Sequence, residues 1–114
     1  MRERRQVSND KVDELIVFLT PYVRSLLERV EADEFTTTQF IEVMHLDPQS
    51  EIAYQQAISE WGENENNARL VIHGQVIPAA LRASGKVEWI GFAHEEEDPW
   101  SVPAWWRLIT DDPE

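Results

Sequence analysis

The stretch that decides the fold runs from Arg69 to Ile109 and reads RLVIHGQVIPAALRASGKVEWIGFAHEEEDPWSVPAWWRLI. Four of the five tryptophans lie in it. Its first half spaces apolar residues as a helix does, and its second half alternates them as strands do. We predict a helix over residues 75–83, followed by a C-terminal β-hairpin. Residues 70–72 fit a short buried strand as well as the first turn of a helix.

The two strands of this hairpin are rich in aromatic residues. In the first strand, alternation places Trp89 on one face and Phe92 on the other. In the return strand, the adjacent Trp105 and Trp106 must point to opposite faces. One of these two indoles can therefore fill the core. The other then meets solvent, the first helix or a partner.

A long amphipathic helix is predicted over residues 8–32, at the start of the chain. Its apolar residues recur every three or four positions, and this stripe keeps its phase across Pro21. We therefore expect one kinked helix, which could pack on its own core or on a copy of itself. Residues 1–7 and 111–114 are expected to be flexible tails.

Two further helices have well-specified ends. Thr36 and Gln39 match a capping box, in which each residue bonds the other's backbone N–H group. Asp47 and Pro48 suit the N-cap and the first position of the next helix. Gly62 suits the left-handed residue that ends it.

Four segments carry a resemblance to known proteins: FTTTQFIEVM, AYQQAISEW, HGQVIPAALRASG and the hairpin from VEWIGF to VPAWWRL. Their order resembles the winged-helix superfamily over residues 36–110, and it is similar to wing domains at the ends of some phage and plasmid replication proteins. The length predicts a single domain of residues 1–114. The resemblance implies an α+β, mostly helical, winged-helix-like fold, and it leaves the first helix unexplained. It also implies a recognition helix at residues 75–84 and a wing tip at residues 94–98.

Composition restricts the function. The formal net charge is -12, from 22 acidic and 10 basic residues, and a field of that sign repels phosphate backbones. The absence of cysteine excludes disulfides, thiolate catalysis and cysteine-ligated metals. No signal peptide and no run of about 20 apolar residues is present. These features predict a cytoplasmic protein that does not enter a membrane.

Catalytic and ligand-binding patterns are missing from the sequence. No serine lies in a nucleophile elbow, no glycine-rich phosphate loop is present, and the three histidines lack metal-ligand spacing. His94 stands beside acids that we interpret as a solvated loop, and His73 is expected to have a local structural role. We therefore predict no enzyme, no metal and no cofactor.

The first hypothesis for function is a non-enzymatic regulatory or adaptor module that binds a protein partner or itself. Tryptophan is enriched among the residues that dominate binding energy at interfaces, and clustered acids would select a basic partner. The residues expected to bind the partner are Trp100, Trp105, Trp106, Glu95, Glu96, Glu97 and Asp98.

The alternative hypothesis is a winged-helix DNA-binding regulator that acts as a dimer through its first helix. Between Arg69 and Phe92 the only acid is Glu88, so the bases of this stretch could form a local positive face. The residues expected to contact DNA are Gln75, Arg82, Ser84, Lys86 and Arg107. The net charge and the acidic wing tip disfavour this hypothesis. A third possibility is an acidic mimic of nucleic acid that occupies a basic groove on another protein.

Overall fold

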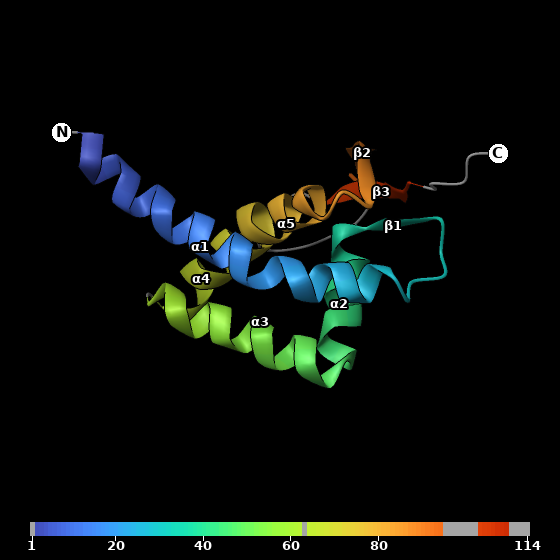
Figure 1. Cartoon of the computed structure of the whole chain (residues 1–114), viewed down its shortest axis with the longest axis horizontal. Coiled ribbons are helices and arrows are strands. Elements are labelled where there is room, and N and C mark those ends of the chain that lie inside the picture. Colours follow the sequence, from blue (N-terminus) through green and yellow to red (C-terminus); the bar gives the residue numbers. More distant parts are fainter. Residues whose placement is uncertain (1, 63, 95–102, 110–114) are drawn as a thin grey trace.

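The computed structural model describes residues 2–62, 64–94 and 103–109, with side chains from Lys11 onward. Its fold is α+β and mostly helical (Figure 1). The elements in chain order are α1 (Arg2–Leu27), β1 (Glu34–Thr36), α2 (Thr37–Leu46), α3 (Pro48–Trp61), α4 (Glu65–Val71), a π-helical turn η1 (Ile72–Val76), α5 (Ile77–Ser84), β2 (Val87–Phe92) and β3 (Ala104–Leu108).

The first helix is displaced toward the N-terminus relative to its predicted bounds. α1 begins at Arg2 rather than Ser8, because the N-terminal Arg, Glu and Gln residues favour helix. Residues 2–7, which were expected to form a tail, are part of α1. α1 ends at Leu27, where the N–H of Arg29 closes a tighter turn three residues back. The helix continues through Pro21, so a single helix was correctly predicted.

The predicted helix ends of α2 and α3 are confirmed. The Thr36 hydroxyl accepts the N–H of Gln39 at 3.1 Å, and the Gln39 side chain accepts the N–H of Thr36 at 3.0 Å. Asp47 caps α3 by accepting the N–H of Ser50 at 2.9 Å. Gly62 follows α3 with a φ of 87°, the left-handed conformation that glycine adopts without strain.

The described strands form an antiparallel sheet in the order β1-β3-β2. The hairpin of β2 and β3 was predicted, whereas β1 was not. β1 pairs with β3 so that Phe35 lies opposite Trp106, and β2 pairs with β3 so that Trp89 lies opposite the same residue. Trp106 therefore sits on the central strand with an aromatic neighbour on each side.

The ambiguous residues 70–72 are helical, and α4 runs through the π turn directly into α5. In this wider turn the N–H of Ile77 donates to the carbonyl of Ile72, five residues earlier. Pro78 follows immediately. A proline inside an ordinary helix clashes with the carbonyl four residues earlier, here that of Gly74. The wide turn accommodates this proline, which lies near the start of α5.

The hydrophobic core lies between α1, the helices packed on it and the inner face of the sheet. α1 contacts α3 and α5, and its N-terminal turns project beyond them (Figure 1). The largest fully buried side chains include Trp106, Tyr54 and Phe40. Within the described ranges, the helices include none that is both long and apolar enough to cross a membrane.

Candidate interaction surfaces

A β-bulge in β2 brings two aromatic side chains onto one face of the hairpin. Trp89 pairs with Trp106 and Phe92 pairs with Ala104, while the register shifts between Trp89 and Gly91. Trp106 and Ala104 are two residues apart on β3, so they share a face. Trp89 and Phe92 must then share that face too. The prediction that they point to opposite faces was wrong because the bulge adds one residue to β2.

Glycine is required at this bulge by the backbone rather than by crowding. Gly91 has a φ of 137°, a conformation that residues with a Cβ atom rarely adopt. A Cβ atom built on Gly91 would meet nothing within 4 Å. An isolated glycine in a strand pattern is a known sign of a bulge, so this feature had a signal in the sequence.

The aromatic cluster consists of Trp89, Phe92 and His94. The rings of Trp89 and Phe92 meet edge to face, with centroids 5.3 Å apart and planes at 79°. The ring of His94 lies 5.7 Å from that of Phe92. Trp89 is 44% exposed and Phe92 is 54% exposed, so the pair presents apolar ring surface to solvent. Exposed aromatic pairs of this kind are typical of protein-binding surfaces.

The two adjacent tryptophans of β3 have different environments. Trp106 is completely buried, and its indole N–H donates to the hydroxyl of Thr37 at 2.8 Å. The guanidinium of Arg82 lies 5.5 Å from the centroid of the Trp106 ring. The prediction that Trp106 binds a partner was therefore wrong, because helices and cross-strand neighbours cover its face. Trp105 points to the other face and is half-buried.

The remaining residues predicted to bind a partner lie outside the described part of the chain. They are Trp100, Glu95, Glu96, Glu97 and Asp98. In the sequence, the four acids follow directly after His94, the last residue of the aromatic cluster.

Of the five residues predicted to contact DNA, one is buried, two are exposed without an ion pair to another described residue, and two form ion pairs with acids of the same molecule. Ser84 is buried; its hydroxyl donates to the carbonyl of Leu81 at 2.6 Å and accepts the N–H of Lys86 at 3.1 Å. Its side chain therefore stabilises the end of α5, and the prediction that it contacts DNA does not fit this geometry. Gln75 and Arg82 are exposed.

The other two predicted DNA contacts face acids of the same molecule. Lys86 lies 3.9 Å from Glu28. Arg107 lies between two carboxylates, at 3.4 Å from Glu34 and 3.3 Å from Glu88. These ion pairs occupy two of the bases that the DNA-binding hypothesis requires on one positive face. Arg107 and its two acids form a cross-strand charge ladder on the outer face of the sheet instead.

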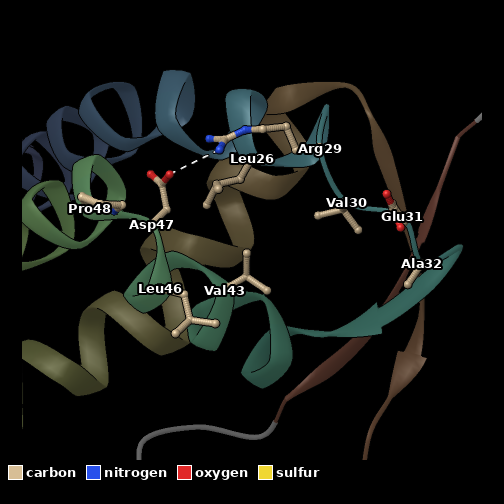
Figure 2. A pocket seen from close by; sticks show the side chains of 9 residues that line it. All are labelled: Leu26, Arg29, Val30, Glu31, Ala32, Val43, Leu46, Asp47 and Pro48. Carbon is tan, nitrogen blue, oxygen red and sulfur yellow. Dashed lines mark hydrogen bonds and ion pairs between the residues drawn. The ribbon is translucent and has the colours of Figure 1, made fainter.

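A second candidate surface is an open groove between the end of α1, the following loop and the junction of α2 with α3 (Figure 2). Its volume is about 540 Å³. The residues that line it are Leu26, Arg29, Val30, Glu31, Ala32, Val43, Leu46, Asp47 and Pro48. Sequence reasoning missed this groove, because its lining comes from three segments whose contact depends on tertiary packing.

Asp47, the N-cap residue of α3, lies at one side of the groove. The carboxylate of Asp47 lies 3.3 Å from Arg29 (Figure 2). The pKa of Asp47 is lowered from its ordinary value, first by the hydrogen bond from the backbone N–H of Ser50, then by the Ser50 side chain, and to a smaller extent by Arg29. The carboxylate is therefore held charged, as an N-cap and an ion pair both require.

A polar cluster connects α2, α3 and the π turn. The buried Tyr54 hydroxyl lies 2.7 Å from Nε2 of His73, in agreement with a local structural role for this histidine. The His45 ring packs on Tyr54 at 4.7 Å, and its Nδ1 lies 2.5 Å from Glu51. Hydrogen bonds from His45, and then from Gln55, lower the pKa of Glu51. Over the described residues, no group of three side chains could hold a metal ion.

Comparisons with known proteins do not name a family for the chain. No protein-family model, no curated protein and no solved structure matches it. The winged-helix resemblance therefore stays a prediction based on the order of the helices and the hairpin.

Proposed function

We propose that this chain is a non-enzymatic regulatory or adaptor module of the cytoplasm. It binds a protein partner, or a second copy of itself, through the aromatic cluster on its hairpin. In this proposal the fold is winged-helix-like, and the hairpin corresponds to the wing. The observation that carries the proposal is the contact between Trp89 and Phe92, two large apolar rings that are 44% and 54% exposed.

Physical chemistry supports binding at this cluster. Rigid aromatic side chains lose little conformational entropy on binding, and they bury large areas. The edge-to-face contact at 5.3 Å holds both rings before a partner arrives. A partner that covers them gains apolar burial without having to order the surface first.

The charge of the chain favours a basic partner. The net charge is -12, and four consecutive acids follow the aromatic cluster in the sequence. Complementary charge steers the encounter and suppresses acidic partners. Aromatic faces also attract Arg and Lys side chains, and the protein itself uses this contact between Arg82 and Trp106.

The same features weigh against the DNA-binding alternative. Ser84 is buried, and both Lys86 and Arg107 lie within ion-pair distance of acids. Of the predicted contacts, Gln75 and Arg82 are exposed and form no ion pair with another described residue. Two such side chains are few for a protein that must overcome its own negative field. The acidic charge supports the third possibility, a mimic of nucleic acid, but no specific geometry of the described residues supports it.

A peptide-selection experiment tests the proposal. A random peptide library displayed on phage would be selected on the purified full chain. We expect the enriched peptides to contain Arg or Lys beside apolar residues. They should bind the wild type and lose binding to Trp89→Ala and Phe92→Ala, because both rings form the surface. Val17→Ala is the control, since Val17 is 71% exposed on α1 and lies outside the cluster.

Two further measurements separate the alternatives. Fluorescence anisotropy with mixed duplex DNA at low and high salt tests the DNA-binding alternative, because phosphate contacts weaken steeply with salt. Sedimentation over a range of protein concentrations tests binding to a second copy. Salt-sensitive DNA binding, or a selection in which no enriched peptide depends on Trp89 and Phe92, would overturn the proposal.

A further inference from the structure

We propose that the groove between α1, α2 and α3 is a second docking site, which receives a cationic amphipathic helix of a partner protein. This site is separate from the aromatic cluster. Its lining comes from the end of α1, the loop after α1 and the α2–α3 junction, and it includes no residue of the hairpin.

The side chains that line the groove provide the apolar contacts of the site. Leu26 is buried at its base, whereas Val43 is 37% exposed and Leu46 is 82% exposed at its edge. Figure 2 shows Leu26, Val30 and Val43 around the same opening. An exposed leucine next to an apolar hollow costs hydration free energy, and a partner's apolar side chain would remove that surface from water.

Charged side chains of the groove provide the electrostatic attraction for a partner. Glu31 lines the groove and is exposed, and among the described residues no cation lies within ion-pair distance of it. The chain as a whole is also acidic, with a formal net charge of -12. The Arg29 guanidinium, which also lines the groove, is engaged by Asp47. Among the described residues that line the groove, the charge still lacking a partner is therefore the negative one of Glu31, and a cationic partner complements it and the acidic body.

The shape of the groove favours a helix over a small molecule. A small ligand binds in a concave pocket that surrounds most of its surface. This groove is open along one side and is bordered by helical segments at the end of α1 and in α2 (Figure 2). An amphipathic helix fits such a groove by placing apolar anchors at positions i, i+3, i+4 and i+7 inside and charged residues along the rims.

A designed peptide tests this inference without knowledge of the natural partner. The probe is a fluorescein-labelled synthetic helix with leucines at i, i+3, i+4 and i+7 and lysines elsewhere. Binding to the full chain is measured by fluorescence anisotropy at low and physiological salt. Two comparison peptides have glutamates in place of lysines, or the same composition in an order without an apolar stripe.

Leu46→Lys is the variant that breaks the site, and Val17→Lys is its matched control. Both positions are highly exposed, at 82% and 71%, and both changes add one positive charge. We expect Leu46→Lys to weaken binding about tenfold or more, because it removes apolar contact and repels the lysines. Val17→Lys should bind as the wild type does. Leu46→Ala, which adds no charge, should show a smaller loss in the same direction.

Three outcomes would overturn the inference. Equal weakening by Val17→Lys and Leu46→Lys would mean that the acidic body as a whole attracts the peptide. Equal binding of the peptide without an apolar stripe would mean that no helix is recognised. A change in the sedimentation of the chain alone on Leu46→Lys would assign the groove to a second copy instead.

Discussion

The hairpin carries aromatic side chains in two different settings, and the contrast separates stability from binding. Trp106, on the central strand, is fully buried and hydrogen-bonded to Thr37. Trp89 lies directly opposite on the edge strand and is 44% exposed. The exposed ring of Phe92 extends the same apolar surface. The two indoles are cross-strand partners on one face. Cover by the helices, rather than residue type, decides which of them stabilises the fold.

Strand position in this hairpin therefore divides the aromatic residues between two roles. A residue on the central strand has neighbours on both sides and helices below, so its ring loses contact with water. A residue toward the end of an edge strand has cover on one side only. Four predictions test this division, from the largest expected effect to the smallest, and a fifth concerns a site far from the hairpin.

Trp106→Ala should give the largest loss of stability. Removal of a fully buried indole leaves a cavity and breaks its hydrogen bond to Thr37, so we expect unfolding to become easier by about 3–5 kcal/mol. Urea denaturation followed by circular dichroism measures this change. Trp105→Ala is the control. Because Trp105 is half-buried, a loss as large as that of Trp106→Ala would remove the basis of the contrast.

Thr37→Val should cost about 2 kcal/mol, because it leaves the buried N–H of Trp106 without its acceptor at 2.8 Å. The valine has nearly the same shape, so the loss reports the hydrogen bond rather than packing. Chemical denaturation of this variant is compared with that of Thr37→Ser, which keeps the hydroxyl. A loss in Thr37→Ser with little or none in Thr37→Val would show that the methyl group of Thr37, and not its oxygen, anchors the hairpin.

Gly91→Ala should cost about 1–2 kcal/mol and displace Phe92 from Trp89. The φ of 137° is strained for any residue with a Cβ atom. Nuclear Overhauser contacts between the two rings report their geometry, and thermal unfolding reports the stability. Glu88→Ala, on the same strand, should change stability by only about 0.5 kcal/mol. Unchanged ring contacts in Gly91→Ala would show that the bulge does not depend on glycine.

Trp89→Ala should cost only about 1 kcal/mol of stability, because nearly half of its surface is already in water. The same variant should lose the selected peptides. Denaturation and peptide anisotropy on one preparation give both values. A stability loss comparable with that of Trp106→Ala would place Trp89 in the core and would contradict a binding role.

Acid pH should give the smallest effect, and it should act far from the hairpin. The pKa of Asp47 is lowered from 3.8 by hydrogen bonds from Ser50 and by Arg29. The unfolded chain therefore binds this proton more tightly than the folded one, so the stabilisation is complete above about pH 4. It is lost as the pH falls through the lower, folded-state pKa. Asp47→Asn keeps an N-cap without a charge, and its stability should fall less in this range.

Some of the fold could be predicted from sequence because its signals are local. The capping box of Thr36 and Gln39 and the cap by Asp47 involve residues three positions apart, so neighbouring residues alone specify them. The hairpin was predicted from alternation in two aromatic strands. The order of helices before a hairpin was also correct.

Other features could not be predicted because they depend on distant residues. β1 has only three residues and is a strand because β3 supplies its hydrogen bonds. Which of Trp105 and Trp106 is buried depends on where the helices lie. The groove at Leu46 exists because α1 ends beside α2. Among the missed features, the bulge at Gly91 did have a local signal, and simple alternation overrode it.

The π turn between α4 and α5 has a consequence for insertions and deletions. A π turn holds one residue more than an α-helical turn, so it takes up an extra residue without rotating the helix after it. Ala68 before the turn and Leu81 after it are both fully buried. Deleting one residue within 72–76 would preserve that alignment, but it would place Pro78 in an ordinary helical turn, where its ring clashes with the preceding turn. The same deletion within α5 would turn the rest of that helix by about 100° away from α1.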